Sequence, residues 1–237
     1  MKTNVALTLA LVVGASAVHA SPAQDVRKIH LAWDLALGAD GRIEHLKLRG
    51  KWPNDLRERL EQDIRNWQFT PGRIGDRYAS TTTTLNVALE VRPAAEGAWN
   101  VYIDSATTGG RVRREAQATY PERAYIASRQ GLVILRIVYD ETGKVTNSDI
   151  ADFSPLRSGS LVGAARSAVK RFEIEPERVD GRPLGATAYL PICFVASRRD
   201  NPCTWTRPGS AEKLDERSAF SFESVTSLKT DVSGRVL

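Results

Sequence analysis

A short pattern occurs twice in this chain, and it restricts the fold more than any other feature of the sequence. Trp67-x-Phe69-x-Pro71 is matched 105 residues later by Phe172-x-Ile174-x-Pro176. Apolar residues before and after the two patterns coincide at the same offset: Leu56, Leu60 and Ile64 with Leu161, Ala165 and Val169, and Leu85, Val87 and Leu89 with Leu190, Ile192 and Phe194. Self-similarity at a fixed spacing predicts two copies of one structural unit.

The stretch before each pattern predicts a β-hairpin followed by a helix. Apolar residues alternate with polar ones in 29–37 and again in 133–139, as in half-buried strands. A glycine turn follows each strand, at Gly41 and at Gly143, because glycine supplies the positive φ that hairpin turns need. The return strands share one break in alternation, with Ile43, Leu46 and Leu48 in register with Val145, Ser148 and Ile150. We therefore expect an α+β fold in which each unit is an antiparallel β-hairpin, a helix and a closing strand.

The second copy resembles the C-terminal domain of the TonB energy-transducer family. That family pattern opens with Tyr-Pro, present here as Tyr120-Pro121, and continues through a strand to an Asp-x-Gly-Lys/Arg-Val turn, here in residues 140–145. A helix, an aromatic-x-aliphatic-x-Pro exit at 172–176 and a closing strand at 190–194 complete the order. The resemblance implies a protein-binding domain, in two tandem copies of which the first has diverged.

The first copy departs from the family pattern, because Ser21-Pro22-Ala23-Gln24-Asp25 stands where Tyr-Pro would be. Trp99, Val101 and Ile103 predict an added strand that pairs with 81–91. The Ser-rich tail has one strand-like patch at Phe220 and Phe222, which leaves an extra strand and a mobile tail both open. The expected organisation is a signal peptide at 1–20, a divergent TonB-like repeat at 25–106, a linker at 107–117, a TonB C-terminal-like domain at 118–205 and a polar tail at 206–237.

The first 20 residues predict export. A positive start at Lys2, an apolar run over 5–13 and small residues before Ser21 are typical of a cleaved secretory signal peptide. The alternative is an uncleaved membrane anchor, which we favour less because a span needs about 20 apolar residues. Removing Lys2 lowers the formal net charge from +5 to +4. This mild, scattered excess does not indicate nucleic-acid binding. We expect a periplasmic protein that contacts a membrane only if the leader is retained.

The two cysteines, Cys193 and Cys203, are expected to form a disulfide, because exported proteins fold in an oxidising compartment. In a strand, Cys193 points away from the face of Ile192 and Phe194, which leaves it free to meet Cys203 across a short loop. Two unrelated thiols are the alternative. The spacing is not Cys-x-x-Cys, so we expect a structural disulfide without a redox role.

No catalytic or metal-binding constellation is apparent. His30 and His45 lie on expected strands without further ligands at a suitable spacing, and Glu173 and Glu175 are best interpreted as solvated charges. We expect no enzyme activity, no cofactor, no small-molecule substrate and no nucleic-acid partner.

The expected mechanism is β-augmentation, in which an extended peptide adds a strand to an open sheet edge. The candidate edge is 186–194, where Pro191 removes one donor. The expected partner-binding residues are Tyr120, Pro121, Arg123, Thr187, Tyr189, Leu190 and Ile192. In the resembled family the Tyr-Pro motif lies near the site that grips the N-terminal box of outer-membrane receptors.

The expected partner is thus an envelope or outer-membrane protein. The alternatives are a structural scaffold associated with peptidoglycan, and a short energy transducer if the leader is retained. A motor-coupled TonB needs a membrane anchor and a long proline-rich spacer, and the sequence after the leader passes directly into the first copy.

Overall fold

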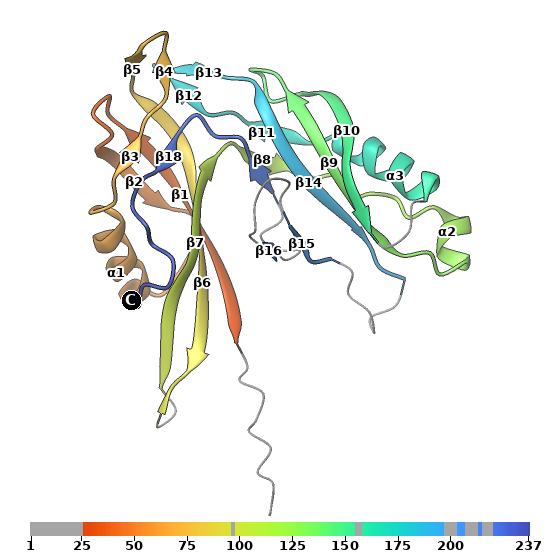
Figure 1. The fold of residues 1–237 in the computed structure, drawn as a ribbon, viewed down its shortest axis with the longest axis horizontal. Helices are drawn as coiled ribbons and strands as arrows, with labels where there is room; N and C mark the ends of the chain where they lie inside the picture. The colour runs from red at the N-terminus through yellow and green to blue at the C-terminus, as the bar shows by residue number, and fades with distance from the viewer. Residues whose placement is uncertain (1–25, 96–97, 155–157, 197–202, 207–212, 215–219) are drawn as a thin grey trace, which may run out of the picture.

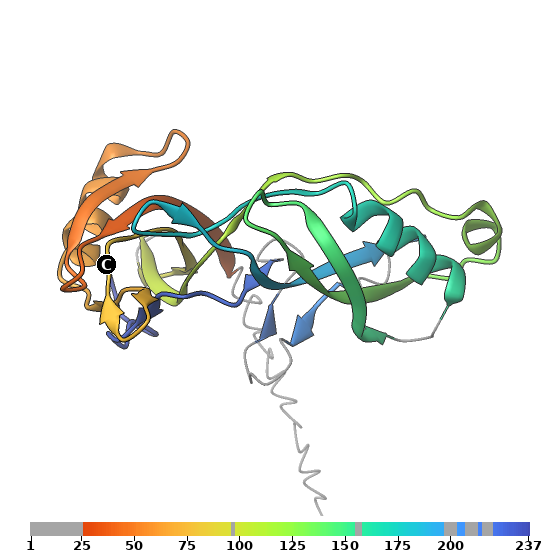
Figure 2. The same ribbon diagram turned by 90° about the horizontal axis from the view of Figure 1, so that it is seen from above.

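The computed structural model describes residues 26–95, 98–154, 158–196, 203–206, 213–214 and 220–237. Its fold is mixed and consists mostly of strands, with two larger antiparallel sheets, each packed against one 11-residue helix, and several two-stranded pairings (Figure 1). Figure 2 shows the two sheets lying end to end along the long axis of the molecule. We call the part built on the first sheet the first unit and the part built on the second sheet the second unit. Among the described residues, no helix has the length and apolar character needed to cross a membrane.

In the first unit, β1 (Arg27–Leu37) lies between β2 (Ile43–Leu48) and β6 (Thr81–Pro93). Helix α1 (Asn54–Ile64) starts directly after Pro53, which suits a first turn, and buries Leu60 and Ile64 against the sheet. The expected added strand is confirmed, since β7 (Trp99–Gly109) pairs with β6. The core is formed mainly by Leu31, Trp33, Leu35, Leu37, Leu60, Ile64, Trp67, Phe69, Leu85, Val87 and Leu89.

In the second unit, β9 (Gly131–Tyr139) lies between β10 (Val145–Ser154) and β14 (Ala186–Phe194). Helix α3 (Gly159–Val169) covers one face, and the short α2 (Glu122–Ile126) begins after Pro121. The core is formed mainly by Val133, Leu135, Ile137, Tyr139, Leu161, Ala165, Ala168, Val169, Phe172, Ile174, Leu190, Ile192 and Phe194.

The shared break in alternation is a β-bulge at the same place in each hairpin. In the first unit Ile43 pairs with Leu37 and His45 pairs with Ala36, which leaves Glu44 as the extra residue. In the second, Val145 pairs with Tyr139 and Asn147 pairs with Val138, which leaves Thr146 extra. A bulge moves the following side chains to the other face. This is why apolar residues three positions apart share one face there.

The two hairpin turns also pack in the same way. Gly41 and Gly143 have φ angles of +81° and +83°, in the left-handed region that favours glycine. A Cβ on Gly41 would lie 2.2 Å from the carbonyl oxygen of Phe69, and one on Gly143 would lie 1.7 Å from that of Ile174. Each glycine therefore allows its turn to rest on the backbone that leaves the helix.

Short strands extend each unit after its helix. In the first unit these are β3 (Phe69–Thr70), β4 (Arg73–Ile74) and β5 (Arg77–Tyr78). In the second they are β11 (Glu173–Glu175), β12 (Arg178–Val179) and β13 (Arg182–Pro183). β12 pairs with the start of β6, so backbone hydrogen bonds join the second unit to the first sheet.

The segment expected as a linker, 107–117, is largely extended. Residues 107–109 end β7, and β8 (Arg111–Arg114) pairs with β11, with Val112 opposite Ile174. Glu173 and Glu175, on β11, form ion pairs with Arg114 and Arg111 across this ladder. Their carboxylates therefore neutralise cations on the neighbouring strand. The expected signal peptide, 1–20, lies outside the described residues.

The described part of the tail forms strands. After β15 (Trp205–Thr206) and β16 (Lys213–Leu214), β17 (Ser221–Phe222) pairs with β14 in the second unit. The chain then crosses to the first unit, where β18 (Ser227–Leu228) pairs with β3 (Figure 1). Leu228 lies opposite Phe69, just as Val112 of β8 lies opposite Ile174. β18 in the C-terminal tail thus occupies the position in the first unit that β8, the strand preceding the second unit, occupies in the second.

Candidate partner-binding edge

The outer edge of β14 is only partly covered. On one side β14 pairs with β9 from Ala186 to Phe194. On the other side, β17 pairs with Ala188 and Tyr189, and the Glu223 amide donates to the Thr187 carbonyl. Along the rest of this edge, no strand in the described part of the chain pairs with β14.

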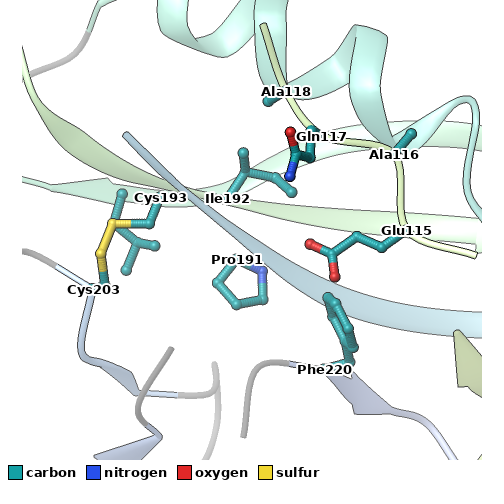
Figure 3. Close-up of a pocket in the computed structure, with 10 residues that line it drawn as sticks. Glu115, Ala116, Gln117, Ala118, Pro191, Ile192, Cys193, Cys203 and Phe220 are labelled. Carbon is teal, nitrogen blue, oxygen red and sulfur yellow. A yellow bond between two sulfur atoms is a disulfide. The ribbon is translucent and has the colours of Figure 1, made fainter. Parts of the chain in front are cut away.

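A groove of about 720 Å³ continues along β14 where β17 stops (Figure 3). Its lining comes from the segment before α2 (Glu115, Ala116, Gln117 and Ala118), from β9 (Leu132), from β14 (Pro191, Ile192 and Cys193) and from the C-terminal part of the chain (Cys203 and Phe220). Figure 3 shows Pro191 and Cys193 on β14, with the 115–118 segment and Phe220 at the sides of the groove. The small alanine side chains leave room beside the strand.

The alternation of backbone groups determines what this edge offers. In an antiparallel strand, successive residues direct their N–H and C=O groups to opposite sides. The Thr187 carbonyl faces β17, so the backbone groups of Tyr189, Pro191 and Cys193 share its side. Pro191 has no N–H, so beyond the described pairing with β17 this side of β14 presents the carbonyls of Pro191 and Cys193 and the amide of Cys193.

The expected site residues of β14 divide into two groups. Thr187 is buried, and its hydroxyl accepts a 3.4 Å hydrogen bond from Arg136, while Tyr189 is half-buried on the face away from α3. Leu190 and Ile192 are 0% and 7% exposed and pack in the core below α3. Ile192 also reaches the groove lining, whereas Leu190 contributes to the core alone.

Tyr120 and Pro121 lie at the far end of the same strand. The Tyr120 ring packs edge-to-face on Phe194, with 5.4 Å between centroids, and its hydroxyl donates a 2.7 Å hydrogen bond to the Arg129 carbonyl. Pro121 precedes α2, and Arg123 is exposed on that helix. The contacts of Tyr120 therefore fix the position of the chain directly after the 115–118 segment, which lines the groove.

The expected disulfide between Cys193 and Cys203 is present, with 5.7 Å between the Cα atoms. Cys193 points away from the α3 face, as expected from strand alternation, and lies beside Tyr189. The chain after Cys203 places Trp205 against Leu132 and Ile134, which buries the second face of β9. The disulfide thus closes one side of the groove.

Two aromatic residues of the tail belong to this site and were expected only as a strand-like patch. Phe222 is 8% exposed and packs edge-to-face on Tyr139, and Phe220 packs in the same way on Phe172, each with 6.1 Å between centroids. Their spacing in a Ser-rich segment was the one signal in the sequence, and it did not reveal which strand they join.

Glu177 was not expected as part of the site, because a charged residue after a proline is usually exposed. Its side chain is 3% exposed and accepts hydrogen bonds from the Ser224 hydroxyl at 2.7 Å and the Val225 amide at 2.9 Å. Burial raises the pKa of the Glu177 carboxyl, while hydrogen bonds from Thr83, Ser224 and Val225 oppose that shift. This carboxylate holds the tail just after β17.

The two histidines considered as metal ligands both lie on the first sheet. His30 and His45 lie on neighbouring strands β1 and β2. Within the described ranges, no group of three or more His, Cys, Asp or Glu side chains could hold a metal ion.

The comparisons with known proteins give a match in the second unit. A search of curated proteins finds no match to the chain. The family model described as the Gram-negative bacterial TonB protein C-terminal matches residues 116–196, a range that starts at the groove and includes both β14 and Tyr120. Residues 116–196 are therefore similar to the TonB C-terminal family, and the first unit lies outside the match.

Proposed function

We propose that the chain is a periplasmic TonB-like binding module, and that its second unit binds an extended segment of an envelope or outer-membrane transport protein along β14. The observation that carries this proposal is the half-covered edge of β14 beside a groove. The family match over 116–196 supports it, because the match includes that edge.

The binding energy would come from backbone hydrogen bonds and from burial in the groove. Each net hydrogen bond contributes about 1 kcal/mol, so a short ladder gives modest affinity and the groove adds selectivity. Pro191 interrupts the ladder, which limits the strand to fewer bonds than an uninterrupted edge would give.

The first unit is proposed to be a diverged copy, over 25–106, that supports the binding unit over 118–205. The equivalent bulges and turn glycines support a common origin. Its closing strand β6 is covered by β7 and by β12 on the side that corresponds to the free edge of β14. The first unit therefore has no open counterpart of the binding edge, and we assign it a scaffolding role.

The test is a binding titration of the full mature chain with labelled peptides that carry the N-terminal boxes of outer-membrane receptors. Ala118→Trp fills the groove and is expected to weaken binding at least tenfold. Ala151→Trp, at an exposed position on the opposite edge of the same sheet, is the matched control and is expected to leave the affinity unchanged.

Pro191→Ala provides a second, opposite change. It restores one backbone donor on the free edge, so the peptide is expected to bind up to about tenfold more tightly. Equal affinity in wild type and Ala118→Trp, together with retention of the chain on isolated cell wall, would favour the peptidoglycan-associated scaffold instead.

A further inference from the structure

We propose that residues 220–223 act as an internal ligand of the β14 edge, and that the partner segment replacing them carries two large apolar side chains two residues apart. This inference rests on the proposed function and specifies the partner. The chain's own tail occupies the start of the edge in an antiparallel direction, so it shows which side chains fit there.

The first side-chain position, that of Phe222, is closely surrounded by other residues. Phe222 lies opposite Ala188 and packs on Tyr139. A Cβ on Gly109 would lie 2.5 Å from the Phe222 Cβ, and one on Gly110 would lie 3.2 Å from its ring. The two glycines are thus required for a large ring to enter at this position.

The second position follows two residues earlier. Phe220 packs on Phe172 and at the same time lines the groove beside Pro191. In a partner strand bound in the same antiparallel register, the residue just before the Phe220 position would lie opposite Pro191, and the residue three before it would lie opposite Cys193. A partner bound in this register would place its aromatic pair at the C-terminal end and would run its preceding residues along the groove, where Ala116 and Ala118 leave space.

The internal ligand is short, and this makes exchange favourable. β17 has two residues, and the Glu223 amide adds one further bond to the edge. A partner strand that also spans Cys193 gains the bonds that β17 does not make. The tail beyond it is held separately by β18, so the exchange needs to displace only 220–224 and breaks the hydrogen bond from Ser224 to Glu177.

The register also predicts which partner side chains matter least. The residue at the Ser221 position lies opposite Tyr189, and its side chain points to the other face of the sheet from Phe220 and Phe222. The partner motif is therefore aromatic-x-aromatic with a free central residue.

The test uses a fluorescein-labelled peptide with the sequence of residues 217–225 and the full mature chain. In the double variant Phe220→Ser, Phe222→Ser the internal ligand is weakened, and the peptide is expected to bind at least tenfold more tightly than to wild type. A peptide with both phenylalanines changed to serine is expected to bind neither protein. Equal affinity of the first peptide for both proteins would overturn the proposal.

Because Phe222 is a core residue, a milder variant keeps the test valid if the double variant does not fold. Ser224→Ala removes one hydrogen bond to the Glu177 carboxylate and leaves the aromatic contacts in place. The affinity for the labelled 217–225 peptide is expected to increase about tenfold, since a hydrogen bond to a charged group contributes about 1.5 kcal/mol. An unchanged affinity would contradict the proposal that the tail competes with the peptide for the β14 edge.

Receptor-box peptides separate this inference from the function on which it rests. If these peptides bind wild type and the tail variants equally, the β14 edge binds partners but the tail does not compete, and only the internal-ligand proposal fails. If they bind none of these proteins, and the 217–225 peptide also binds none, the proposed function fails as well.

Discussion

The Ser224 hydroxyl lies 2.7 Å from a carboxylate oxygen of Glu177 and donates a hydrogen bond to it. Ser224 stands between β17 and β18 in the tail, whereas Glu177 belongs to the second unit between β11 and β12. The Thr108 hydroxyl of β7 lies 3.1 Å from the Ser224 hydroxyl and donates a 2.7 Å hydrogen bond to the Thr226 carbonyl. One buried acid therefore connects the tail with both units.

Replacing Glu177 by Gln is expected to change how stability depends on pH. The raised pKa means that the folded state holds more protons than the unfolded state between pH 4.5 and the folded pKa, so the free energy of unfolding falls as the pH rises through this window. Gln cannot ionise, so the melting temperature of the variant relative to wild type should increase from pH 4 to pH 8. Parallel melting curves across this range would show that the carboxyl does not titrate in the way proposed.

The turn glycines are expected to differ in how well they tolerate alanine. Gly143→Ala should cost about 3 kcal/mol or more, because it combines a positive φ with a clash against the Ile174 carbonyl. Gly181→Ala is the control, since its φ is also positive, at +74°, but nothing lies within 4 Å of the added Cβ. That change should cost about 1 kcal/mol. Urea denaturation measures both, and equal losses would contradict the close packing of the turn.

The end of the tail is expected to stabilise the first unit. Val232 is 5% exposed and packs in the first core, so Val232→Ala should lower the free energy of unfolding by about 2 kcal/mol. Val236→Ala is the matched control at 62% exposure and should change it by less than about 0.5 kcal/mol. Hydrogen exchange should show the loss in β1 and β6 first, and protection lost first in β9 would contradict this assignment.

Opening the disulfide is expected to destabilise the second unit. The two cysteines are separated by 10 residues, and a closed loop of that size contributes about 2.5 kcal/mol in the chain-entropy description. Cys193→Ser, Cys203→Ser should show this loss in thermal or urea unfolding. Reductant should lower the stability of wild type by a similar amount and leave the double variant unchanged; a response of the variant would point to another cause.

The central elements of both units could be predicted because their side chains repeat with a regular period. The alternation over 29–37 and 133–139 predicted β1 and β9, and the turn glycines located the hairpins. The break in alternation is present in both return strands and is explained by a bulge. The pairing of β7 with β6 was predicted from the same alternation, whereas the disulfide was predicted from the oxidising compartment expected for an exported chain with two cysteines.

The short strands could not be predicted, because two or three residues do not define a period. β8, β12, β17 and β18 owe their conformation to distant partners: Val112 pairs with Ile174, and Leu228 pairs with Phe69. Glu177 was missed for a different reason. Its residue type predicts exposure, whereas its burial is tolerated because Thr83, Ser224 and Val225 donate hydrogen bonds to it, the last two from the tail.

The pairing of β18 with β3 has a consequence for how the polypeptide matures. Phe69 is synthesised more than 150 residues before Leu228, yet the two end up as neighbours on one ladder. The half of the molecule that leaves the ribosome first therefore reaches its final form only when the last residues arrive. Until that moment the early half lacks one strand of its ladder and a core valine, Val232.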